Sequence, residues 1–169
     1  MAETCEVCGF EWDAIGPGDV APRLASATYG MAHVLGADER LVTSRPDPER
    51  WSALEYAAHV RDVVLNIRDR VFVGLAEENP VTKPMYRDLR IPFYREETPA
   101  DVASELTMAA AMFLRVFTAL DDRQLARTLV YAYPREASRS VLWVAAQALH
   151  EAEHHLGDAR EDLTAVASR

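Results

Sequence analysis

The chain contains little cysteine, a single lysine and no long apolar run. Of its 169 residues, 2 are cysteines, Cys5 and Cys8, and Lys83 is the lysine. No stretch of about 18 apolar residues is present, so we expect no membrane-spanning helix. The formal net charge is −9, and the acidic residues are spread along the chain. Because phosphate contacts need clustered lysine and arginine, this charge argues against nucleic-acid binding as the main role.

The N-terminus has no basic region followed by an apolar one, so we expect no signal peptide and a cytoplasmic location. The length fits one domain with a full core. We divide the chain into an N-terminal segment, residues 1–17, and a helical domain, residues 18–169.

Three of the 5 histidines lie in one short stretch, residues 150–158. Side chains four residues apart share a helix face. The stretch therefore holds two interleaved pairs, His150 with His154 and Glu151 with His155, and either pair could hold a metal ion. On a helical projection, Glu151 and His155 lie at the edge of the apolar face, whereas His150 and His154 point outward. Outward histidines are more often ordinary solvated residues.

A third ligand candidate, His59, lies in the stretch 51–62. Ser52 and Glu55 form a capping-box pattern there, which predicts the start of a helix, and His59 follows two turns later. Taken alone, His59 is better interpreted as a buried histidine that hydrogen-bonds Glu55 or Asp62. Beside the pairs of residues 150–158, a ligand role is the favoured interpretation. Asp62 is then expected to hold the imidazole in one tautomer.

The stretches 51–62 and 151–158 resemble the DinB-like superfamily of four-helix bundles, which includes thiol-dependent maleylpyruvate isomerases and bacillithiol transferases. The resemblance covers about residues 18–165. In that superfamily one histidine of the second helix and two residues four apart on the last helix bind a divalent metal. The resemblance implies His59, Glu151 and His155 as ligands, with glutamate where many members have histidine. A register one residue earlier selects His150 and His154 instead, so the choice stays open.

Three protein ligands leave an open coordination position, which is typical of catalytic zinc, and nickel also suits this set of nitrogen and oxygen ligands. The resemblance implies that a low-molecular-weight thiol binds the metal as thiolate and attacks a small-molecule electrophile. Asp62 or Asp158 would support the ligands by hydrogen bonds. The favoured function is a thiol-dependent transferase or isomerase. Two alternatives stay open: a metal-stabilised binding or stress-response protein that forms a homodimer, and a metal-dependent hydrolase.

The two cysteines form a Cys-x-x-Cys knuckle followed by Gly9. In a cytoplasmic protein this spacing is more typical of metal binding or redox chemistry than of a structural disulfide. A structural zinc needs four ligands. We therefore hypothesise that Cys5, Cys8, His150 and His154 bind zinc and attach the N-terminal segment to the last helix. An N-terminal segment with free thiols is the alternative.

The hydrophobic pattern predicts an all-α four-helix bundle with long crossover loops. The expected helices cover 19–37 with Asp19 as cap, 52–78, 98–120, and a last helix from Ser138 or Ser140 to about 167, with a short turn at 122–126. Residues 80–97 are predicted to have little regular structure, and 128–137 to form a loop or brief extended piece. The first connection supplies candidates for binding an anionic substrate or thiol: Tyr86, Arg87, Arg90, Tyr94 and Arg95. Surface ion pairing is the alternative for each of them.

Overall fold

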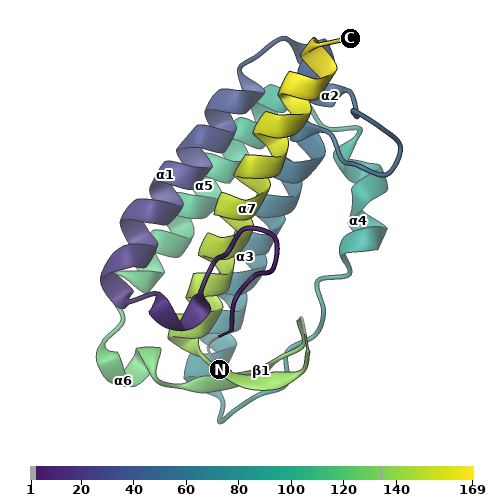
Figure 1. The fold of residues 1–169 in the computed structure, drawn as a ribbon. Coiled ribbons are helices and arrows are strands. Elements are labelled where there is room, and N and C mark those ends of the chain that lie inside the picture. The colour runs from purple at the N-terminus through teal and green to yellow at the C-terminus, as the bar shows by residue number, and fades with distance from the viewer. Residues whose placement is uncertain (1–2, 134) are drawn as a thin grey trace.

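A computed structural model describes residues 3–133 and 135–169, so Met1, Ala2 and Pro134, which fall within the predicted 1–17 segment and 128–137 connection, lie outside the described residues. Four long helices form a bundle, and the predicted all-α class is confirmed. They are α1 (Pro17–Leu35), α3 (Ala53–Ala76), α5 (Pro99–Phe117) and α7 (Val141–Ala167). Helices α1 and α7 run in one direction and α3 and α5 in the other (Figure 1). Helix α7 packs chiefly against α1 and α3, and so does α5.

Side-chain caps set the starts of three long helices where the sequence predicts them. The Ser52 hydroxyl accepts a hydrogen bond from the Glu55 amide (3.2 Å), and the Glu55 carboxylate accepts one from the Ser52 amide (2.8 Å). Thr98 caps α5, and the Ser140 hydroxyl accepts from the Trp143 amide at the start of α7 (3.0 Å). These bonds satisfy amides that have no partner within the helix.

The prediction that Asp19 caps the first helix is wrong by one turn. Helix α1 begins at Pro17, and the Asp19 carboxylate accepts from the amide of Gly16 (2.8 Å). Proline suits the first helical position because its missing N–H would have no partner there. Further along α1, a Cβ at Gly30 would lie 2.9 Å from Cδ2 of Leu156. The absence of a side chain there allows α1 and α7 to approach closely.

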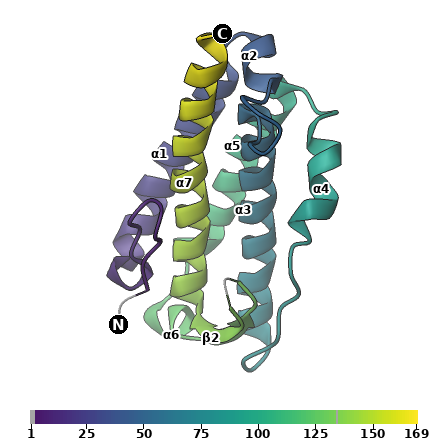
Figure 2. The ribbon, with the colours of Figure 1, turned by 45° about the vertical axis from the view of Figure 1, so that its right-hand side comes forward.

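The connection from α3 to α5 is more ordered than predicted. It contains helix α4 (Arg87–Tyr94), which stands beside α3 outside the bundle (Figure 2). The Tyr94 side chain is buried, and its hydroxyl donates to Asp62 of α3 (3.0 Å). Arg90 pairs with the same carboxylate (2.6 Å). These contacts anchor a helix that contains Pro92, a residue that normally interrupts helices.

Short elements close the two ends of the bundle. Helix α2 (Glu39–Thr43), which was not predicted, lies between α1 and α3 in the chain, and α6 (Asp122–Leu125) matches the predicted turn. Strand β1 (Thr128–Tyr131) pairs antiparallel with β2 (Ala137–Ser140), so the predicted extended piece is part of a hairpin. Within the two described ranges, none of the helices combines the length and hydropathy needed to cross a bilayer.

The N-terminal segment crosses the outer face of α7 (Figure 1). It includes a single-turn 3-10 helix, η1 (Trp12–Ala14), and the Trp12 ring stacks on Trp143 of α7 with centroids 5.8 Å apart. Arg139 also pairs with Glu3 (2.7 Å). The segment is therefore packed against the bundle.

Candidate metal centre

The facing sides of α3 and α7 bring together three residues predicted as metal ligands. His59 comes from α3, and Glu151 and His155 come from consecutive turns of α7. Nε2 of His59 and Nε2 of His155 each lie 3.3 Å from Oε2 of Glu151. Two imidazoles thus converge on one carboxylate oxygen.

These distances, which are long for hydrogen bonds, also match the spacing of donor atoms around a metal ion. An N–H···O bond usually measures about 2.7–3.2 Å. Two donors on a tetrahedral zinc, each bonded at about 2.0–2.1 Å, lie about 3.3–3.4 Å apart. The imidazole–carboxylate distances of 3.3 Å match that second value. Two nitrogens and one oxygen are also a donor set that zinc and nickel accept.

Hydrogen bonds from residues behind the centre fix the two α7 side chains. Nε2 of Gln147 donates to Oε1 of Glu151 (2.7 Å), and the Trp12 indole donates to Oε1 of Gln147 (2.8 Å). Nδ1 of His155 lies 2.8 Å from the Asp158 carboxylate. Such contacts hold ligand side chains in one orientation. The predicted Asp158 support therefore has the required geometry.

The predicted role of Asp62 is wrong. Its carboxylate accepts from Arg61 (3.0 Å), Arg90 (2.6 Å) and Tyr94 (3.0 Å). Nδ1 of His59 is buried and has no hydrogen-bond partner among the described residues. Donors from α3 and α4 occupy the Asp62 carboxylate, and the described residues show no hydrogen bond from it to the His59 imidazole. The alternative of a bond from His59 to Glu55 also fails, because Glu55 pairs with Arg45 and Arg95.

The electrostatics of the centre combine one carboxylate with imidazoles of different basicity. Burial would raise the pKa of Glu151, but the adjacent imidazoles of His150, His155 and His59 lower it well below its usual range. Burial lowers the pKa of His59. Burial would also lower the pKa of His155, but Asp158 and Glu151 raise it to about 9. At neutral pH, both ring nitrogens of His155 therefore carry a proton, and a metal ion would replace one of the two.

Aromatic rings and one arginine surround this centre. The rings of Trp51 and Tyr56 pack on the histidines, with centroids 5.3 Å apart for Trp51 and His59 and 5.1 Å apart for Tyr56 and His155. The half-exposed Arg87 lies over the Trp51 ring (5.5 Å). Its positive charge also contributes to the lowered pKa of His59, after burial and the charge of His155. Arg87 also pairs with Asp88 of the same helix (3.1 Å).

The other four candidates of the α3–α5 connection are placed differently. Arg90 and Tyr94 bind Asp62, and Arg95 pairs with Glu55 (2.8 Å). Tyr86 is exposed and has a left-handed backbone conformation with φ 54°. For Arg87, which pairs with Asp88 (3.1 Å), as for Arg90 and Arg95, the ion-pair alternative describes the structure.

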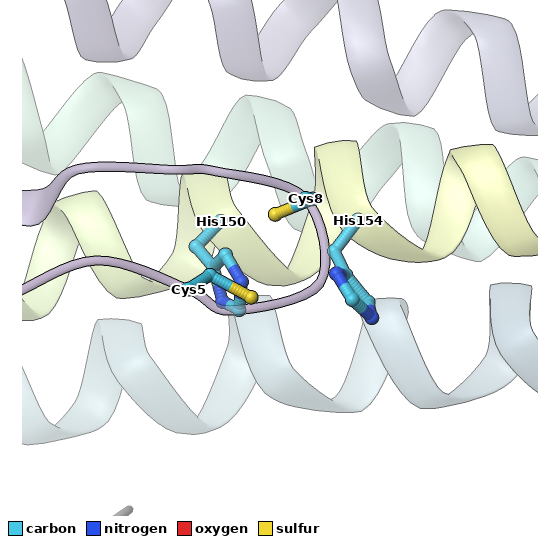
Figure 3. A group of neighbouring side chains, drawn as sticks. All are labelled: Cys5, Cys8, His150 and His154. Atoms are coloured by element: carbon cyan, nitrogen blue, oxygen red, sulfur yellow. The ribbon is translucent and has the colours of Figure 1, made fainter.

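The second interleaved pair of α7 faces the N-terminal segment. His150 and His154 lie with Cys5 and Cys8 in a cluster whose potential ligand atoms are all within 4.8 Å of one another (Figure 3). The interpretation of His150 as an ordinary solvated residue is wrong, because it is 7% exposed. Burial would raise the pKa of Cys5, but backbone amides of Cys8 and Val7, with His150, lower it to about 7.

Sequence reasoning missed Gln147 and Trp12 as partners of the centre. Gln147 stands one turn before Glu151 and is the polar residue in an apolar run, residues 141–149, which is a usable signal. Its side chain is 1% exposed, and a buried amide requires hydrogen-bond partners. The contact with Trp12 spans 135 residues and had no local signal.

Comparison with known proteins gives a consistent family and fold. The sequence model of the DinB superfamily matches residues 28–159, most of the chain. None of the curated proteins matches significantly. Among solved structures, YfiT from Bacillus subtilis superposes with a TM-score of 0.79 over 89% of each chain, at 13% sequence identity. YfiT is described as a probable metal-dependent hydrolase with an unusual four-helix bundle topology. The family match over residues 28–159 and the shared bundle show that this chain belongs to the DinB superfamily.

Proposed function

We propose that the chain is a divalent-metal-dependent enzyme and that His59, Glu151 and His155 hold its metal ion. The observation that carries this proposal is the convergence of two imidazole nitrogens on one carboxylate oxygen at 3.3 Å. Three protein ligands leave a coordination position for a further group, as in catalytic zinc sites. Zinc is the favoured ion, and nickel is the alternative.

A divalent ion in this centre would supply a Lewis acid that lowers the pKa of a water or thiol beside it. The chain's own residues contribute orientation and charge. Asp158 holds the His155 ring, and Gln147 holds the Glu151 carboxylate. Arg87 offers a positive charge to an anionic substrate or thiol from the solvent side.

Within this class we propose thiol-dependent transfer or isomerisation of a small electrophile. In the transfer reaction, the thiolate sulfur of a low-molecular-weight thiol forms a bond to carbon. The leaving group departs with the electron pair of its own bond, and the thiol proton passes to solvent. The resemblance to thiol-dependent members of the superfamily and the position of Arg87 support this reaction.

Hydrolysis is the second candidate, favoured by the description of YfiT, whose fold this chain shares, as a probable metal-dependent hydrolase. The two reactions differ in one requirement that can be measured. Turnover of a model electrophile that depends on added thiol supports transfer, and turnover of an ester or amide without thiol supports hydrolysis. A protein that binds metal but catalyses neither reaction would support the non-catalytic alternative.

Metal content of wild type and His59→Ala tests the centre itself. We expect His59→Ala to lose about one metal ion per chain and all activity, because two of three ligands cannot retain the ion. His33→Ala is the matched control, since His33 is exposed on α1. Unchanged metal content in His59→Ala would refute the assignment of this centre.

A further inference from the structure

We propose that Cys5, Cys8, His150 and His154 form a second, structural zinc site that fastens the N-terminal segment to α7. The two thiols come from one turn of the segment and the two imidazoles from consecutive turns of α7 (Figure 3). Their potential ligand atoms all lie within 4.8 Å of one another. This set is separate from the three residues of the proposed catalytic centre.

The turn that carries the cysteines is already folded for binding. The Gly9 amide donates to the Cys5 carbonyl (2.9 Å), and the Cys5 amide donates to the Phe10 carbonyl (2.8 Å). Gly9 has φ +73°, a conformation that residues with a side chain rarely adopt. These bonds hold both thiols above α7, as Figure 3 shows.

The histidine nitrogens provide an independent indication of a bound ion. His150 is more than nine-tenths buried, and neither of its ring nitrogens has a hydrogen-bond partner among the described residues. Nδ1 of His154 also lacks one. The rings of Phe10 and Trp12 pack against His150 with centroid distances of 5.1 and 4.6 Å. An unsatisfied buried nitrogen is destabilising, and a metal ion would satisfy it.

The chemistry of the four groups fits a structural zinc ion. Two thiolates and two imidazoles are a standard tetrahedral set, and four protein ligands leave no open position. Sulfur and nitrogen donors on such an ion lie about 3.5–3.8 Å apart. The four ligand atoms, which all lie within 4.8 Å of one another, are close to that spacing. A hollow of about 560 Å³, lined in part by Cys8 and His154, gives the ion a route from solvent.

Zinc content measured on the full chain tests the proposal. The protein is purified under reducing conditions without chelator, supplied with zinc and freed of the excess. We expect about two zinc ions per wild-type chain and about one in the double variant Cys5→Ser, Cys8→Ser. Val7→Ser is the matched control, because Val7 is 81% exposed in the same turn and bears no ligand atom. Equal zinc content in wild type and the double variant would overturn the site.

Cobalt substitution distinguishes this site from the proposed catalytic centre. We expect a thiolate-to-cobalt charge-transfer band in wild type, His59→Ala and His33→Ala. The band should disappear in the double variant Cys5→Ser, Cys8→Ser, which removes both thiolates and changes one atom in each side chain. If His59→Ala keeps full metal content, the proposed function fails, but the band still reports on the cysteines. A wild-type protein without the band overturns the second site, even when the catalytic centre is occupied.

Discussion

His150 and Glu151 are neighbours in the chain, and although Nδ1 of His150 lies only 3.7 Å from Oε1 of Glu151, the two side chains belong to different clusters of metal-ligating residues. Glu151 points toward His59 of α3 (3.3 Å), whereas His150 packs under Phe10 of the N-terminal segment. Successive residues of a helix are turned by about 100°, so adjacent positions reach different faces. His155 and His154 repeat the arrangement one turn later. One short stretch of α7 therefore contributes to both clusters, and His154 and His155 also meet at Asp158.

Gln147 links the N-terminal segment to the proposed catalytic centre, so its replacement should affect metal binding. In Gln147→Leu the Trp12 indole loses a buried hydrogen bond and the Glu151 carboxylate loses a partly buried one. We expect zinc affinity of the centre to fall roughly 10- to 100-fold. Competition with a chromophoric chelator measures this change, and Gln124→Leu on the distant α6 is the control. Equal affinities in the two variants would show that the link does not support the ligand.

The two aspartates predicted to support the ligands should respond differently to replacement by asparagine. Asp158→Asn weakens the contact with Nδ1 of His155, and we expect roughly 10- to 100-fold weaker zinc binding. Asp62→Asn removes the charge that joins α3 to Arg90 of α4. It should lower the free energy of unfolding by roughly 1–3 kcal/mol and leave zinc affinity unchanged. Weaker zinc binding in Asp62→Asn would contradict the geometry.

Glu55 should make the protein sensitive to acid. Burial would raise its pKa, but hydrogen bonds from Arg45, Ser52 and Arg95 lower it to about 2. Because the folded pKa lies below the unfolded value, the stabilisation is complete above about pH 4.5 and is lost as pH falls toward 2. The pKa difference corresponds to about 3 kcal/mol at neutral pH.

Urea unfolding of Glu55→Gln as a function of pH measures this contribution. The variant should be less stable than wild type at pH 7, and the difference should shrink steadily below about pH 4.5. Glu136→Gln, an exposed change, serves as the control. A difference that stays constant down to pH 2 would mean that the charge of Glu55 is not responsible.

Arg87 should govern the binding of an anionic substrate or thiol. It is half-exposed and lies over Trp51 beside the centre. In Arg87→Gln we expect KM for the anionic partner to rise roughly tenfold with little change in kcat, since binding is weakened without loss of the reacting groups. Arg123→Gln, on the distant α6, is the control. A fall in kcat alone would assign Arg87 a different role.

The parts of the structure that follow from local pattern could be predicted from the sequence. The caps at Ser52 and Thr98 and the facing of Glu151 and His155 depend on helix periodicity, and they appear as expected. Helix α4 was missed because Pro92 normally interrupts a helix, and its anchor on Asp62 is a tertiary contact. The contact between Tyr94 and Asp62 also explains why the predicted role of Asp62 in orienting His59 is wrong.

Long-range packing limited the rest of the prediction. The residue types of the cysteine and histidine cluster suggested a site, but no local signal brings the N-terminal segment to α7. Burial of His150 depends on Phe10 and Trp12, which pack on it across most of the chain. The hydrogen bond between Trp12 and Gln147 spans 135 residues and has the same origin.

The separation of His59 and Glu151 along the chain has a consequence for folding. The two residues are 92 positions apart, so their meeting requires closure of a long loop that includes α4, α5 and the β hairpin. Closing such a loop costs conformational entropy, and the contact forms only after most of the chain has collapsed. An ion bound between α3 and α7 would act as a cross-link that closes this loop. Its loss should therefore raise the rate of global unfolding, while each helix keeps its conformation in the folded protein.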